Sequence, residues 1–372
     1  MKKTLLIAAA ALVAFAACTK SEIDSANFSQ ELSFAPNALN TKALILPDGN
    51  SPEELAFPTG EAFNVFAFAD LADGDGVHYG TPLMNDVEIS FHSTTTGGDW
   101  KATTGTYLWP ATGTVDFFAY YPGTLTAAYD SISSPKGITL TGVSLGTIVG
   151  SQIDPLTAGT LAQQSSLKKT VPMVFKHITS QIAACAYDAT ETSSLQGKIS
   201  IKKVVFKSLN TTGDYTEGTT TGAGEWTNVN GLNDFTIFQG SEVLDTTENY
   251  LSAGSFAAAI DNSAAFVVIP GGISNGVQTI EVTYAIAAYT INGFDYPATP
   301  AKTVSIPLYN RVSGNTFQNG KRYVFHLGIS LDGANNEIMF APTVLGWTNE
   351  DISGITIDAI NSIDGSNAIL LD

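Results

Sequence analysis

The sequence predicts an all-β protein made of two β-sandwich domains in tandem. Only 14% of its 372 residues are charged, against about 25% in an average soluble domain, and long solvated helices need charged outer faces. The chain is instead rich in Thr, Ser, Gly, Val, Ile and Phe, which are residues of strands and turns. Apolar and polar residues alternate along many short runs, and a chain of this length favours two domains over one.

The alternating runs follow one another along the chain and end at Gly, Pro or Asn turns. Residues 63–68 are apolar on both faces, which predicts a central strand covered on both sides. The best candidate for a helix is 154–167, with Pro155 near its start and Gly159 inside it. Further strands are expected at 114–121, 199–207, 266–269, 277–286, 302–308 and 322–331.

A Gly-, Ser- and Thr-rich stretch at 142–170 marks the expected boundary between the two domains. The predicted parts of the chain are a signal peptide at 1–18, a tether with an N-terminal strand at 19–42, an N-terminal sandwich at 43–170, a C-terminal sandwich at 171–350 and a tail at 351–372.

The N-terminus predicts export as a lipoprotein. Two lysines precede an apolar run at 5–17, which is shorter than the ~20 residues that span a bilayer and fits the core of a signal peptide. Small residues lie directly before Cys18, as in a bacterial lipobox, where the Cys carries the lipid. Position 19 is Thr and not Asp, which by resemblance to such signals indicates the outer membrane. The alternative is an ordinary secretory signal in which Cys18 has no role.

The net charge of −18 excludes several classes of partner. Nucleic-acid binding needs clustered Lys and Arg, so no nucleic acid is expected, and docking on anionic lipid is disfavoured. With two Cys and four His in the chain, neither a zinc site nor a disulfide framework is predicted, and no cofactor is expected.

Ordered aromatic motifs carry a family resemblance. The string YLWP at 107–110 precedes VDFFAYYP at 115–122, and the other segments are 57–65, 174–177, 266–270, 320–327 and 338–347. In this order, and with the lipobox, they resemble the fimbrillin-like proteins of Bacteroidales, which include the major and minor subunits of type V pili. The resemblance implies two transthyretin-like β-sandwich domains and a structural, non-enzymatic subunit of cell-surface fimbriae. It also implies a lipoprotein precursor that is cut by a trypsin-like protease and joined to other pilin subunits by β-strand exchange.

Lys42 meets the requirement for an isolated protease site. It is the sole Lys or Arg between residues 21 and 100, and prolines flank its segment, so an exposed loop is expected. Cleavage there makes Ala43 the new N-terminus and removes a strand containing Leu32, Phe34 and Phe28. The alternative is a solvated lysine in a loop.

The C-terminal tail has the pattern of a donor strand. Residues 323–372 contain no Lys or Arg, so a trypsin-like protease spares them. Alternating apolar positions would fill the pockets of a neighbouring subunit, and they are Ile355, Ile357, Ala359 and Ile363. The alternative is that this is the last strand of its own domain.

Other constellations give weaker predictions. Cys185 lies in an apolar run and is expected to be a small buried residue. Asp70, Asp73 and Asp75 resemble a crude calcium loop, but the Glu that such a loop requires is absent in register, so a turn is favoured. Four tryptophans suggest a glycan-binding platform, although packing in the core is the commoner fate. They support the alternative function, a non-polymerising surface lipoprotein that binds glycans, and they are Trp100, Trp109, Trp226 and Trp347.

Overall fold

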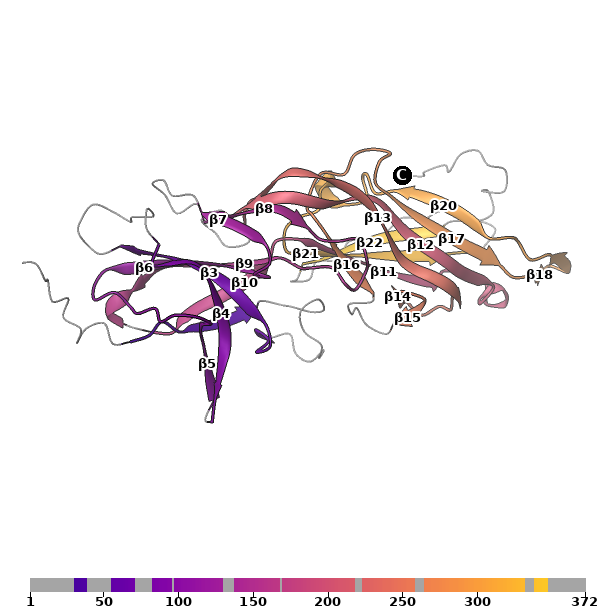
Figure 1. Cartoon of the computed structure of the whole chain (residues 1–372). Helices are drawn as coiled ribbons and strands as arrows, with labels where there is room; N and C mark the ends of the chain where they lie inside the picture. The colour runs from indigo at the N-terminus through magenta and orange to yellow at the C-terminus, as the bar shows by residue number, and fades with distance from the viewer. Residues whose placement is uncertain are drawn as a thin grey trace, which may run out of the picture.

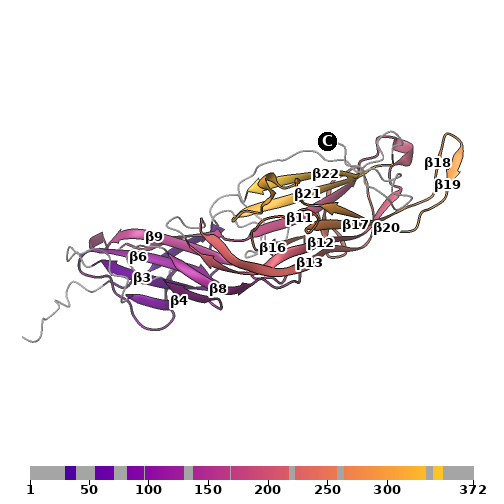
Figure 2. The ribbon, with the colours of Figure 1, turned by 90° about the horizontal axis from the view of Figure 1, so that it is seen from above.

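The computed structural model confirms the all-β fold class. It describes residues 30–38, 55–70, 82–95, 97–129, 137–167, 169–217, 223–257, 264–331 and 338–346. The molecule is elongated, with an N-terminal and a C-terminal unit placed end to end (Figure 1 and Figure 2). None of the helices in this part of the chain combines the length and the apolar character that crossing a bilayer requires.

The N-terminal unit is a sheet that closes on itself. Its order is β10-β9-β6-β3-β4-β5-β1-β2, and β1 also pairs with β10, which joins the two sides of the sheet. The strands are β1 (Phe34–Ala38), β2 (Leu55–Ala56), β3 (Ala62–Asp70), β4 (Met84–Thr94), β5 (Gly97–Ala102), β6 (Thr114–Tyr121), β9 (Leu156–Gln164) and β10 (Val171–His177).

Strand β3 is apolar on both faces because each face packs in a different cluster. Phe63 and Val65 point into the core of the N-terminal unit, where they are fully buried. Phe66 and Phe68 point to the opposite side and pack with residues of the C-terminal unit. The strand lies between β4 and β6 in the sheet, so the prediction of a central, doubly covered strand is confirmed.

The C-terminal unit consists of two facing sheets and one small hairpin. The first sheet contains β11 (Ser180–Asp188), β14 (Asn249–Ser252), β15 (Ser255–Ala257), β16 (Ala265–Val268), β21 (Lys321–Ile329) and β22 (Ile338–Gly346). The second contains β7 (Thr126–Tyr129), β8 (Ile138–Ser144), β12 (Ile199–Thr216), β13 (Glu225–Val243), β17 (Thr279–Ile286) and β20 (Lys302–Pro307). The hairpin is made by β18 (Tyr289–Ile291) and β19 (Phe294–Tyr296).

The two facing sheets bury one apolar core. Alternate residues of β11 and β21 point inward, and Phe325 of β21 meets Phe206 of β12 edge to face with ring centroids 5.2 Å apart. The intervening residues of β11 and β21 therefore point to the outer face of their sheet. The alternation of inward and outward residues along β11 and β21 therefore decides which side chains meet on the outer face of this sheet.

A third cluster, the junction cluster, connects the two units. The β7–β8 hairpin lies in sequence between β6 and β9 of the N-terminal unit, yet β8 pairs with β12 of the C-terminal unit. The predicted boundary near residue 170 is not tested by this pairing and stays a prediction. The buried members of the junction cluster are Phe66, Phe68, Phe118, Tyr120, Ile138, Leu140, Val143, Leu145, Ile178, Tyr215, Val267 and Ile269.

The helix expected at 154–167 is wrong, because most of this segment forms strand β9 between β6 and β10. Its Thr residues and Gly159 favour an extended chain, and the flanking strands supply hydrogen-bond partners that an isolated helix lacks. Strands β12 and β13 run as one long antiparallel hairpin that includes most of the Gly- and Thr-rich stretch at 211–234. In the described residues the helices are short 3₁₀ turns, η1 (Ser165–Leu167), η2 (Ser193–Leu195) and η3 (Ser313–Asn315).

Candidate functional site

The N-terminal strand β1 is set into a slot between strands from elsewhere in the chain. It pairs in parallel with β10 over five residues, from Phe34 opposite Val171 to Ala38 opposite Phe175. On its other side it pairs with β2, and Phe34 lies opposite Trp100 of β5. The residues before β1 continue these backbone contacts, since the Leu32 amide donates to the Tyr107 carbonyl at 2.8 Å.

The apolar side chains of this segment complete the core of the N-terminal unit. Leu32 is 1% exposed and Phe34 is 3% exposed. The Phe34 ring meets Phe63 and Phe117 edge to face, with centroids 6.3 Å and 5.7 Å away. Without this segment, β10 loses a partner along five residues and aromatic core side chains lose their cover.

The residues predicted from sequence to carry function lie outside the described residues. These are Cys18, Lys42, Ala43, Ile355, Ile357, Ala359 and Ile363, together with Phe28 of the N-terminal segment. Their roles stay predictions. What the structure describes is the strand that ends at Ala38, four positions before Lys42.

The tryptophans do not form a surface platform in the part of the chain that the structure describes. Trp100 and Trp109 are 8% and 2% exposed and belong to the N-terminal core. Trp226 is half-buried at the junction cluster, where its Nε1 donates to the Ile178 carbonyl at 2.7 Å. Trp347 lies outside the described residues.

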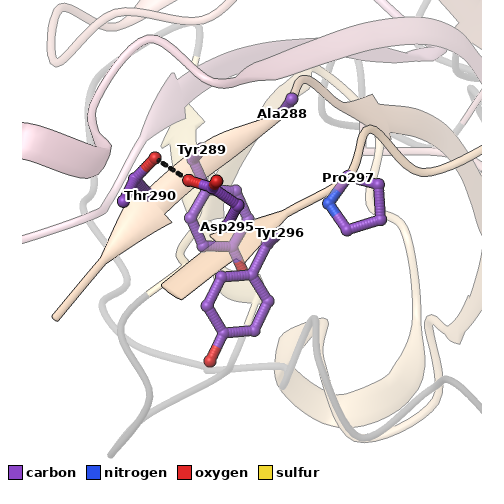
Figure 3. Close-up of a pocket in the computed structure, with 6 residues that line it drawn as sticks. All are labelled: Ala288, Tyr289, Thr290, Asp295, Tyr296 and Pro297. Carbon is purple, nitrogen blue, oxygen red and sulfur yellow. Dashed lines mark hydrogen bonds between the residues drawn. The ribbon is translucent and has the colours of Figure 1, made fainter. Parts of the chain in front are cut away.

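Exposed aromatic rings occur instead on the β18–β19 hairpin, which projects at the far end of the C-terminal unit (Figure 2). Phe294 is 70% exposed and Tyr296 is 43% exposed. The rings of Tyr289 and Tyr296 stack at 4.9 Å with an interplanar angle of 7°. They line a shallow cavity of about 360 Å³ in which Thr290 donates a hydrogen bond to Asp295 (Figure 3).

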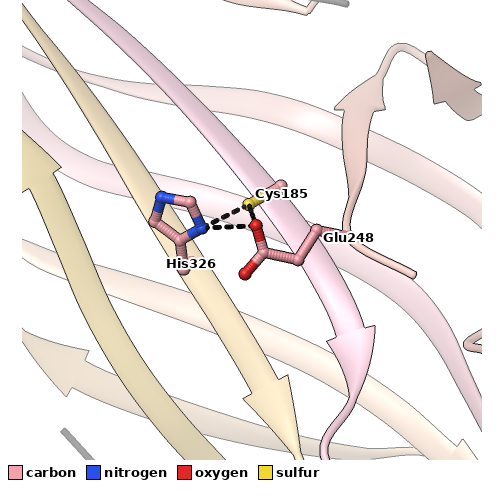
Figure 4. A group of neighbouring side chains, drawn as sticks. All are labelled: Cys185, Glu248 and His326. Carbon is pink, nitrogen blue, oxygen red and sulfur yellow. Dashed lines mark hydrogen bonds and ion pairs between the residues drawn. The ribbon is translucent and has the colours of Figure 1, made fainter. Parts of the chain in front are cut away.

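A second group of chemically active side chains lies on the outer face of the first C-terminal sheet. Cys185 of β11, Glu248 before β14 and His326 of β21 point toward one another (Figure 4). Burial, and then the negative charge of Glu248, raise the pKa of the Cys185 thiol. The group is therefore a protonated thiol near neutral pH, which argues against a cysteine nucleophile.

The buried position predicted for Cys185 is confirmed, but nothing in the sequence indicated the cluster. The three residues are far apart along the chain, and His326 has no Cys at a motif spacing in the sequence. The parallel pairing of β11 with β21 places Cys185 opposite His326. The cluster could have been predicted only by first predicting that β11 pairs with β21.

Buried polar contacts fix the turn between the two units. The His177 imidazole, at the end of β10, lies 2.7 Å from an Asp154 carboxylate oxygen. Thr179 donates to the other oxygen of Asp154 at 2.8 Å. In the next strands, Arg322 Nε donates a hydrogen bond to Gln181 Oε1, and burial lowers the pKa of Arg322 to about 10. Because the Asp154 carboxylate is paired with His177 and Thr179 away from water, these contacts favour one geometry of the connection.

The observed arrangement defines a class of protein. Two all-β units lie end to end, and a strand from the N-terminus completes the first unit by insertion between other strands. This is an all-β architecture of two units in tandem. The chain belongs to the fimbrillin-like family, whose model matches residues 47–347. The resemblance drawn from the aromatic motifs is confirmed.

Similar solved structures include two that are described as a fimbrial protein and a fimbrial assembly protein. A fimbrial protein from Bacteroides vulgatus ATCC 8482 is 17% identical with a TM-score of 0.54, and the match covers 85% of this chain and 99% of that one. A fimbrial assembly protein from Parabacteroides distasonis ATCC 8503 is 13% identical with a TM-score of 0.41, covering 87% and 98%. No curated protein sequence matches this chain.

Proposed function

We propose that this protein is a structural, non-enzymatic subunit of cell-surface fimbriae that contributes to adhesion. Membership of the fimbrillin-like family supports a role at the cell surface together with other fimbrial subunits. The B. vulgatus structure with the same fold is itself described as a fimbrial protein.

The observation that carries the proposal is the position of β1. Leu32 and Phe34 are buried in the N-terminal core, while the backbone of β1 bridges β5 and β10. Cleavage after Lys42 would sever this segment from the rest of the unit and leave an apolar slot with unpaired strand edges. Such edges bind a further strand, because the main-chain ladder and the alternating pockets are already formed.

In the proposed sequence of events, the precursor is exported and lipidated at Cys18 and reaches the outer membrane. A trypsin-like protease then cuts after Lys42, so that Ala43 becomes the N-terminus. The slot vacated by β1 accepts a strand from another subunit, and the tail with Ile355, Ile357, Ala359 and Ile363 is the candidate donor. The side chains of the donor would replace those of Leu32 and Phe34.

The first test is N-terminal sequencing of the surface-exposed protein from cells. We expect the wild-type protein to begin at Ala43. The Lys42→Ala variant should instead begin at Cys18 and run as a monomer on SDS gels loaded without boiling. Lys42→Arg keeps the site for trypsin-like enzymes, and Lys169→Ala, an exposed lysine before β10, is the matched control. Polymers formed normally by Lys42→Ala would rule out this processing site.

The second test addresses the donor. Deletion of residues 351–372 removes the candidate strand but leaves the slot intact, so cleavage at Lys42 is expected to continue while polymers disappear. Replacing Ile355 and Ile357 by Asp should have the same effect, because charged side chains do not fill apolar pockets. Normal polymers from the deleted chain would show that the tail is not the donor.

A second candidate function is a surface lipoprotein that binds glycans without polymerising. The observation in its favour is the projecting β18–β19 hairpin with Phe294 and Tyr296 exposed, since aromatic faces and nearby polar groups suit sugar rings. N-terminal sequencing separates the two functions: a lipidated start at Cys18 in the mature protein favours the binder or an anchoring subunit, and a start at Ala43 favours the polymer.

A further inference from the structure

Three side chains that can bind a metal ion meet on the outer face of the first C-terminal sheet (Figure 4). Cys185 of β11 lies opposite His326 of β21 in the parallel pair, and opposite Tyr250 of β14 on its other side. Glu248 is two residues before Tyr250, so it reaches the same face. One ligand atom from each of the three groups lies within 4.8 Å of the other two.

The distances within this cluster leave one histidine nitrogen with two close neighbours. Nδ1 of His326 is 3.0 Å from Sγ of Cys185 and 2.9 Å from Oε2 of Glu248. Nδ1 offers either one proton or one lone pair, so it makes one full hydrogen bond at a time. The carboxylate can only accept. It accepts from the Cys185 thiol, whose Sγ lies 3.8 Å from Oε2, as well as lying beside Nδ1. A cation can take the place of these protons, because thiolate, imidazole and carboxylate then all direct a lone pair at the same centre.

The cluster is buried against apolar residues on the Cys185 side and exposed to solvent on the Glu248 side. Cys185 is 2% exposed and packs with Ala183, Ala265 and Val324. The side chains of His326 and Glu248 are 20% and 46% exposed. An ion can therefore enter from solvent beside Glu248 and bind against apolar residues, which exclude water from the sulfur side.

The mixture of donor atoms selects the kind of metal. Calcium and magnesium take oxygen ligands, whereas sulfur, nitrogen and oxygen together suit zinc. Zinc is held at about 2.3 Å from sulfur and about 2.0 to 2.2 Å from nitrogen and oxygen, in a tetrahedral arrangement. Three protein ligands would leave a fourth position for water on the exposed side.

We propose that Cys185, Glu248 and His326 form a binding site for Zn²⁺. On binding, the thiol proton passes to solvent and the thiolate sulfur, Nδ1 and a carboxylate oxygen bond to the ion, with no change of oxidation state. The ion would link strands β11 and β21 to the segment that leads into β14, and stabilise the C-terminal unit. This site is independent of strand exchange and departs from the sequence-based expectation of no metal, which rested on counting Cys and His.

Calorimetric titration of the full, metal-free chain with Zn²⁺ tests the proposal. We expect one ion per chain, with affinity at least tenfold weaker in Cys185→Ser and in His326→Gln. His92→Gln is the matched control, because His92 is exposed on β4 in the other unit. Zn²⁺ should raise the unfolding midpoint of wild type and of the control, and have little effect on the two site variants.

Cobalt provides a test that needs no variant. Co²⁺ bound by the wild-type chain through a thiolate gives a sulfur-to-metal charge-transfer band in the near ultraviolet, which added Zn²⁺ should abolish. Absence of this band, or equal Zn²⁺ affinity in wild type and Cys185→Ser, would overturn the proposal. If Cys185→Ser fails to fold, the cobalt spectrum and the more exposed His326→Gln still decide the question.

Discussion

At the scale of single residues, Phe34 connects the N-terminal segment to the core of the first unit. Its ring is 3% exposed and contacts Phe63 and Phe117 edge to face. We expect Phe34→Ala in the uncleaved chain to lower the free energy of unfolding by about 3 to 5 kcal/mol, because it removes a buried ring and leaves a cavity. Urea denaturation measures this loss. Ala35→Ser, at the exposed neighbouring position, should change little.

A loss below about 1 kcal/mol for Phe34→Ala would mean that β1 does not complete the core in solution. The sequence placed Leu32 and Phe34 in an N-terminal strand, as observed for Phe34. It did not indicate the partners of the strand. A parallel pair between residues 34–38 and 171–175 joins segments far apart in sequence, and periodicity within either segment carries no information on that pairing.

Tyr323 gives a pH-dependent contribution to stability. Burial raises the pKa of Tyr323 to about 12, and its hydroxyl accepts a hydrogen bond from the Gln318 amide at 3.0 Å. The neutral phenol is favoured in the folded state, so this contribution is complete below about pH 10 and is lost as pH rises through 12. Between these values the folded state binds the extra proton, and stability falls by up to about 1.4 kcal/mol per pH unit.

Tyr323→Phe removes this titration. The variant should be less stable at pH 8, because the Gln318 amide loses its acceptor, but its deficit relative to wild type should shrink as pH rises from 9 to 12. Urea unfolding across this pH range measures the deficit. A deficit that stays constant would show that Tyr323 titrates in the same way when folded and unfolded.

At the scale of elements, the β18–β19 hairpin differs from the strands of the core. Phe294 is 70% exposed, whereas Tyr289 packs partly against the core of the C-terminal unit. We expect Phe294→Ser to leave the free energy of unfolding within about 0.5 kcal/mol of wild type. Tyr289→Ser should lower it by more, because it loses packing as well as the stack on Tyr296. Denaturation of both variants makes the comparison.

The same substitutions bear on adhesion. If the hairpin contacts sugars, Phe294→Ser reduces binding to glycan arrays while the fold is retained. Equal binding by wild type and Phe294→Ser would exclude this ring from adhesion. If Phe294→Ser greatly lowered the free energy of unfolding, the Phe294 side chain would not be exposed in solution.

Strands with a clear alternation could be predicted from sequence, and those without it could not. Strand β17 alternates regularly between buried and half-buried positions, and the prediction of 277–286 differs from it only in starting two residues before Thr279. Strand β9 shows no simple alternation, because it runs from the fully buried Leu156 to exposed residues such as Leu161. The Cys185 cluster was hidden for a related reason, since its members meet only through the pairing of β11, β14 and β21.

At the scale of the whole molecule, the junction cluster couples the two units. Phe68 and Phe118 extend from the outer face of the N-terminal sheet, with ring centroids 6.2 Å apart, and pack in one cluster with Tyr215 and Ile269 of the C-terminal unit. The β7–β8 hairpin adds backbone hydrogen bonds across the same connection. A continuous apolar contact of this kind favours joint unfolding of the units, and it would hold them in line in a fimbrial subunit under tension.

Calorimetry can test this coupling with two neighbouring residues of β6. Phe117 and Phe118 are both buried, but Phe117 points into the N-terminal core and Phe118 into the junction cluster. Wild type should unfold in one transition, with calorimetric and van't Hoff enthalpies nearly equal. Each Phe→Ala variant should lose about 3 to 5 kcal/mol, but only Phe118→Ala should raise the ratio of the two enthalpies or split the peak. Two separate transitions already in wild type would show that the junction cluster does not couple the units, since each unit would then unfold alone.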